Sequence, residues 1–164
     1  MKFVSIIMGS KSDYDIVSET AKTLEKFGVK YELIISSAHR SPKRTSEYVA
    51  NAEKKGAKVF IAAAGMAAHL AGAIAANTTK PVIGIPMAGS ALSGVDALYS
   101  TVQMPSGMPV ATLAIGKAGA INAAYLAVQI LALEDEGLAN ALKADREAKI
   151  KALEEDSSKV EVIL

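Results

Sequence analysis

The chain reads Ser36-Ser37-Ala38-His39-Arg40-Ser41-Pro42 where an apolar run, residues 31–35, meets a helical pattern. Serine is a common helix cap, and proline suits the first helical position, where no amide hydrogen is needed. We therefore expect His39 and Arg40 to lie in a short strand-to-helix turn. Ligands bind at the carboxyl ends of the strands in an open α/β sheet. A histidine there can move protons near neutral pH, and an arginine can bind a phosphate or carboxylate through two parallel hydrogen bonds.

Apolar runs and helical patterns alternate in the same way along the rest of the chain. Strands are predicted at residues 2–8, 30–35, 58–64, 81–86 and 110–115. Helices are predicted at residues 14–27, at about 42–55, from the turn at 65–72 to about 79, and at 95–103. This alternation is typical of a parallel sheet with right-handed crossovers. We expect an α/β, three-layer, flavodoxin-like fold with a five-stranded parallel sheet of order 2-1-3-4-5.

The expected strand order brings three loops to one edge of the sheet. They follow the first, second and third strands and span residues 10–13, 37–41 and 65–72. Most residue types in the chain that can do acid–base chemistry or hold an anion therefore converge there, at the usual place for a ligand.

The C-terminal part of the chain has a different character. Residues 118–133 form a helical pattern whose clearly polar members are Asn122 and Gln129, and a helix apolar nearly all round must be buried nearly all round. A 17 kDa domain has little interior to spare for it, so we expect a homo-oligomer. Residues 138–153 form a charged amphipathic helix, followed by a tail at 156–164. Its expected apolar contacts are Leu142, Ile150 and Leu153.

Length and composition restrict the class of protein. The 164 residues suit one domain, with a core at 1–133 and a C-terminal helix and tail at 134–164. With 18 basic and 17 acidic side chains, we expect no nucleic-acid partner. The lack of cysteine excludes disulfides and thiol catalysis and fits a cytoplasmic location. Residues 59–76 imitate a membrane span, but they are mostly alanine and glycine, so we expect no membrane contact.

The segment Gly9-Ser10-Lys11-Ser12-Asp13 follows a strand and opens a helix. Free amides at a helix start, together with two hydroxyls, can hold an anion, and Asp13 can instead accept hydrogen bonds from sugar hydroxyls. The alternative is that Ser12 or Asp13 merely caps the helix. Because neither G-x-x-x-x-G-K-[ST] nor G-x-G-x-x-G occurs, nucleoside triphosphates and dinucleotides are disfavoured.

The chain has only two histidines, and they call for different interpretations. His39, with Arg40 beside it at a strand end, favours a functional role. For His69 the residues alone favour a structural role, because it lies in an apolar helix start. Without nearby carboxylates the two histidines do not predict a metal site. The residues alone indicate a small-molecule enzyme that binds a phosphorylated ligand, with His39 moving a proton.

Two other functions of this fold are weakened by the sequence. A receiver domain needs an acceptor aspartate at the end of the third strand, which here reads Ala62-Ala63-Ala64-Gly65. A flavin-binding module usually offers aromatic side chains to the ring, and the strand-end loops supply only Tyr14 and Tyr99.

Five motifs stand in an order found in a known family. They are Met8-Gly9-Ser10-Lys11-Ser12-Asp13, Ser37-Ala38-His39-Arg40, Ala67-Ala68-His69-Leu70, Ala91-Leu92-Ser93-Gly94-Val95-Asp96 and Val102-Gln103-Met104-Pro105. Over about residues 3–133 the chain resembles the N5-carboxyaminoimidazole ribonucleotide mutases, the PurE family (class I) of purine biosynthesis.

The resemblance implies conversion of N5-carboxyaminoimidazole ribonucleotide to 4-carboxy-5-aminoimidazole ribonucleotide, without a metal or organic cofactor. The carbamate would lose carbon dioxide in a closed site, and C4 of the ring would capture it. His39 would act as general acid and then base. Ser10, Asp13 and Arg40 would be the principal substrate ligands, with the phosphate at Ser37 and Arg40 and the ribose at Asp13. The residues implied around them are Ser12, Gly65, Ala67, His69 and Leu70. The family is octameric, with sites lined by more than one subunit.

The chain departs from the family pattern in one loop, the one expected to cover the carbon dioxide. The family usually has a second glycine at the place of Met66, which is bulkier, and a proline at the place of Ala71, which is less rigid. The close alternative is the related aminoimidazole ribonucleotide carboxylase, which uses free carbon dioxide and tends to have lysine at the Arg40 position. Arg40 and His69 favour the mutase. A more distant alternative is a non-catalytic ribonucleotide-binding module.

Overall fold

The computed structural model of the chain describes residues 2–163. Its elements, in chain order, are β1 (Phe3–Met8), the 3-10 turn η1 (Lys11–Asp13), α1 (Tyr14–Lys26), β2 (Tyr31–Ile35), α2 (Pro42–Lys55), β3 (Ala57–Gly65), α3 (Leu70–Ala75), β4 (Val82–Met87), α4 (Val95–Val102), β5 (Ala111–Thr112), α5 (Lys117–Ala132) and α6 (Glu136–Val160). They fall into two compact units, residues 1–128 and 129–164.

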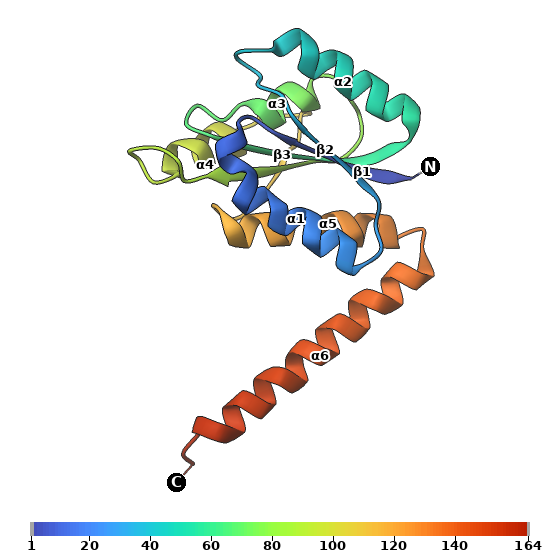
Figure 1. Cartoon of the computed structure of the whole chain (residues 1–164), viewed down its shortest axis with the longest axis vertical. Helices are drawn as coiled ribbons and strands as arrows, with labels where there is room; N and C mark the ends of the chain where they lie inside the picture. The colour runs from blue at the N-terminus through green and yellow to red at the C-terminus, as the bar shows by residue number, and fades with distance from the viewer. Residues whose placement is uncertain (1, 164) are drawn as a thin grey trace. The chain divides into compact units, whose positions relative to one another are not determined.

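The first unit is built on a parallel sheet of order β2-β1-β3-β4-β5, which confirms the predicted flavodoxin-like fold. All residues of β1 and β4 are buried, because helices cover both faces of the sheet. Figure 1 shows α2 and α3 on one face and α1 and the first part of α5 on the other. On the second face, the rings of Phe27 and Tyr125 meet edge to face, with centroids 5.3 Å apart.

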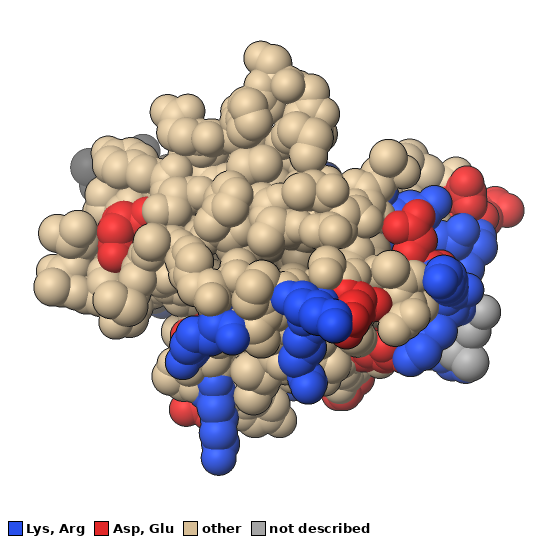
Figure 2. Space-filling view, turned by 90° about the horizontal axis from the view of Figure 1, so that it is seen from above, with Lys and Arg blue, Asp and Glu red and all other residues tan. Residues whose placement is uncertain are grey.

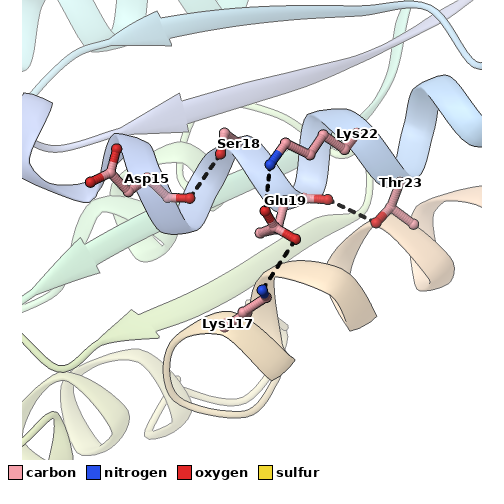
Figure 3. Close-up of polar contacts among 6 residues, drawn as sticks. All are labelled: Asp15, Ser18, Glu19, Lys22, Thr23 and Lys117. Carbon is pink, nitrogen blue, oxygen red and sulfur yellow. Dashed lines mark hydrogen bonds and ion pairs between the residues drawn. The ribbon is translucent and has the colours of Figure 1, made fainter.

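A small polar network joins α1 to the start of α5 (Figure 3). The Glu19 carboxylate lies 2.7 Å from the Lys22 ammonium and 3.6 Å from that of Lys117. The hydrogen bond from Lys22 holds the pKa of Glu19 below its usual value. Both lysines are exposed, so this network adds little to stability and mainly favours one arrangement of the two helices.

The ends of several elements differ from the prediction. The last strand is short: β5 spans only Ala111–Thr112, and it pairs with β4 at the edge of the sheet through these two residues. The third helix ends at Ala75 rather than near Thr79, and the Asn77 side chain donates to the Ala73 carbonyl oxygen there at 2.8 Å. The predicted tail is helical as far as Val160. Residue 164 lies outside the described residues.

The second unit consists largely of α6. None of the described residues of this helix is buried. Of the side chains expected to make apolar contacts, Ile150 and Leu153 are 51% and 71% exposed in the described chain, and Leu142 is half-buried. Among residues 2–163, no helix is long and apolar enough to cross a membrane.

Candidate active site

The three loops predicted to converge do so, around a pocket of about 550 Å³ at the carboxyl ends of β1, β2 and β3. Every residue predicted for the site lines it. The lining residues are Gly9, Ser10, Ser12, Asp13, Ser37, Ala38, His39, Arg40, Ala64, Gly65, Met66, Ala67, His69, Leu70 and Gly89. Two larger hollows, of about 870 and 650 Å³, lie at the amino ends of strands, and their described linings include neither histidine nor arginine. Both histidines and Arg40 therefore line the smaller pocket and not the two larger hollows.

Ser10 organises the loop after β1. Its Oγ accepts hydrogen bonds from the Ser12 amide at 3.3 Å and the Ser12 hydroxyl at 2.9 Å, which caps η1. Asp13 occupies the N-cap position of α1, but within the described residues its side chain makes no capping hydrogen bond. Burial raises the pKa of the Asp13 carboxyl. A ligand hydroxyl that donates to this carboxylate would replace part of the water it has lost.

Arg40 ties the loop after β2 to the loop after β1. Its guanidinium Nη2 donates to the Gly9 carbonyl oxygen at 3.0 Å. The Arg40 backbone amide and Nε both approach the Ser37 hydroxyl, at 3.2 and 3.4 Å. A guanidinium has five N–H donors, so these contacts orient the group and leave donors for a ligand. His39 and Arg40 are both exposed in the pocket.

Pro42 opens α2 as predicted, but Ser41 does not cap it with its side chain in the described structure. The Ser41 hydroxyl faces backwards instead, accepting from the Ser37 amide at 2.9 Å and donating to the Ser37 carbonyl oxygen at 3.1 Å. Beneath it, the buried hydroxyls of Ser36 and Thr45 lie 2.8 Å apart, and the Thr45 hydroxyl also donates to the Ser41 carbonyl oxygen at 3.2 Å. This hydroxyl cluster of Ser36, Ser41 and Thr45, of which Ser36 and Thr45 are buried, supports the turn that carries His39 and Arg40.

We expect Thr45→Val to weaken binding of a phosphorylated ligand in the pocket roughly tenfold, because losing a buried hydroxyl contact costs about 1–3 kcal/mol and loosens the Arg40 turn. Thr45→Ser should restore most of the affinity. The matched control is Thr20→Val, which removes another buried hydroxyl, bonded to the Ala120 carbonyl oxygen at 2.8 Å outside the pocket. Calorimetric titration and urea unfolding would separate the two effects: equal affinity loss in both valine variants would contradict the prediction.

The loop after β3 is held in an unusual backbone conformation. Met66 has a φ of +59°, in the left-handed region, and its side chain is 64% exposed. Leu70 is buried at the start of α3, whereas His69 is exposed and lines the pocket, which argues against the structural role expected from the residues alone. Among residues 2–163, no group of three or more histidine, aspartate and glutamate side chains is arranged to hold a metal ion.

Met66→Gly should raise the free energy of unfolding by about 0.5–1 kcal/mol. The left-handed region costs a residue with a Cβ about 1–2 kcal/mol, and the greater freedom of glycine in the unfolded chain offsets part of that gain. Ala67→Gly is the control, because Ala67 lies in the same loop with an ordinary backbone conformation. This substitution should lower the free energy of unfolding. Urea unfolding measures both, and destabilisation by Met66→Gly would contradict this account.

Five lining residues were not singled out as ligand contacts from the sequence, although three of them lie in the loops expected to form the site: Gly9, Ala38, Ala64, Met66 and Gly89. They have no polar side-chain group, so residue chemistry did not mark them. Gly89 had one available signal, since the expected strand order places the loop after β4 beside the loop after β3.

Comparison with known proteins adds to this geometry. The sequence model of the family "AIR carboxylase" matches residues 3–152. The N5-carboxyaminoimidazole ribonucleotide mutase of Haemophilus influenzae is 54% identical over 144 residues, covering 88% of both chains. That of Bacillus subtilis is 50% identical over 157 residues, covering 96% of this chain and 97% of its own. The crystal structure of Treponema denticola PurE superposes with a TM-score of 0.89 at 29% identity, covering 99% of this chain and 100% of its own.

Proposed function

The chain belongs to the AIR carboxylase family, and from that premise we propose that it is an N5-carboxyaminoimidazole ribonucleotide mutase of purine biosynthesis. The name shared by relatives at 50–54% identity makes it an isomerase. The observation that carries the finer proposal is the pocket, in which His39, Arg40, Asp13 and Ser10 come together from separate loops.

The pocket suits a ribonucleotide in one orientation. Arg40 and Ser37 present N–H and O–H donors at the start of α2, which suits the phosphate. The partly buried Asp13 carboxylate suits the ribose hydroxyls. The base would then lie toward His39 and the loop that contains Gly65, Ala67, His69 and Leu70.

His39 would move two protons in the reaction. The bond between N5 and the carbamate carbon breaks and releases carbon dioxide, and His39 protonates the leaving nitrogen. C4 of the ring then attacks the retained carbon dioxide, forming a carbon–carbon bond, and His39 takes the C4 proton. The reaction needs no further reactant, and the proton lost by His39 in the first step is regained in the second. The loop from Gly65 to Leu70 would hold the carbon dioxide between the two steps.

A second candidate is aminoimidazole ribonucleotide carboxylase, which the description of the matching family favours. It would add free carbon dioxide to the uncarboxylated ribonucleotide. Arg40 and His69 favour the mutase over this candidate. The placement of His39 in the pocket favours an enzyme over a ribonucleotide-binding module without activity.

Turnover of the purified protein with two substrates tests the proposal. We expect fast product formation from the N5-carboxylated ribonucleotide and little from the uncarboxylated ribonucleotide with excess bicarbonate. Activity with only the second would make the chain a carboxylase. Binding without turnover of either would make it a binding module.

We also propose a homo-octamer in the cytoplasm. The exposed apolar side chains Leu92, Val95, Tyr99 and Val102 follow helical spacing along α4 and the residues before it, at 63%, 44%, 64% and 46% exposure. Figure 2 shows a broad area without charged residues on the face that it views. An apolar stripe of this kind is typical of a protein–protein contact, and sedimentation equilibrium would measure the assembly mass.

A further inference from the structure

The imidazole of His69 lies directly over Gly72. A Cβ built on Gly72 would come within 2.7 Å of both ring nitrogens and would overlap Cε1. Real side chains do not tolerate such contacts, so this ring position requires glycine at residue 72.

Helix geometry explains the contact. His69 precedes the first residue of α3, and residues three apart lie on the same face of a helix. The His69 side chain makes no capping hydrogen bond in the described structure, and its ring lies against Gly72. The helix itself cannot yield, because Leu70, Ala71 and Ile74 are 3% exposed or less. The exposed imidazole is the part free to move.

We propose that Gly72 is a positioning residue that holds the His69 imidazole in its place at the pocket. Gly72 is not among the described lining residues, so an added methyl group would act on a ligand indirectly, through His69 or through a shift of α3. The inference rests on the proposed function for its effect on turnover, but the ring position can be tested without it.

The direct test is NMR of the imidazole protons in wild type and Gly72→Ala. The chain has only two histidines, so His39→Asn assigns both sets of signals. We expect Gly72→Ala to shift the His69 signals while those of His39 stay in place. Unmoved His69 signals would overturn the proposal, whether or not the protein turns over any ribonucleotide.

The second test is a double-mutant cycle on kcat/KM for the N5-carboxylated ribonucleotide. We expect Gly72→Ala alone to lower kcat/KM about 10- to 100-fold, because displacing a positioned group by about 1 Å has effects of that size. In a His69→Ala background, the same change should have no further effect. The control is Gly137→Ala in α6, an exposed helical glycine outside the pocket, which should leave turnover unchanged.

The outcomes separate the two proposals. Equal loss from Gly72→Ala with and without His69 would assign the effect to the helix and overturn the positioning role. Turnover of Gly72→Ala within twofold of wild type would overturn it as well. If the wild-type protein shows no turnover but the His69 signals move in Gly72→Ala, the mutase function is refuted and the positioning role of Gly72 is supported.

Discussion

Replacing His39 with asparagine is expected to lower kcat about 10²- to 10⁴-fold, the usual contribution of a general acid–base group. Asparagine keeps a polar side chain of similar reach but cannot accept and return a proton near neutral pH. His39 is exposed in the pocket, so the substitution leaves no buried group unpaired and should not disturb the fold. Affinity for the ribonucleotide product should change by no more than a few fold.

Three measurements on His39→Asn would check this expectation. Single-turnover kinetics report the chemical step, calorimetric titration reports binding, and urea unfolding reports stability. Retained turnover would refute the role of His39 as acid and base. Loss of binding in parallel with turnover would assign His39 to substrate binding instead.

Arg40→Gln is expected to weaken ribonucleotide monophosphate binding about 10- to 150-fold. A hydrogen bond to a charged group contributes about 1.5–3 kcal/mol, which corresponds to that range. The substitution also removes the contact to the Gly9 carbonyl oxygen, which joins the loops after β1 and β2. Because the proposed ligand of Arg40 is a phosphate, the difference in affinity between wild type and Arg40→Gln should shrink as salt concentration rises.

Arg44→Gln is the matched control for Arg40→Gln. Arg44 is an exposed arginine on α2, four residues along the chain, and is not among the described lining residues of the pocket. Both variants lose one positive charge, so a general electrostatic effect would lower affinity equally in both. That result would contradict a specific phosphate contact at Arg40. Arg40→Lys should fall between wild type and Arg40→Gln, because lysine keeps the charge without the planar pair of donors.

The sheet was predictable because its signals are local. Buried parallel strands are continuous apolar runs, such as residues 3–8, and helices show a different period. Alternation of strands and helices leads to a parallel sheet with right-handed crossovers, and this sheet brings its strand-end loops together. Ser10, His39 and His69 converge at one pocket because of this strand order, although they are far apart in sequence.

Other features depend on which atoms meet after folding. The Ser41 hydroxyl turns back to Ser37, and Arg40 bonds to a carbonyl 31 residues away. Met66 adopts a backbone conformation that its residue type disfavours, and Gly72 provides space for an imidazole. Residue type and spacing specify periodicity, turn chemistry and the order of elements, because these arise within a few neighbours along the chain. Packing between distant segments decides the direction of a hydroxyl, the position of an aromatic ring and the length of an edge strand. Only the tertiary structure contains that packing.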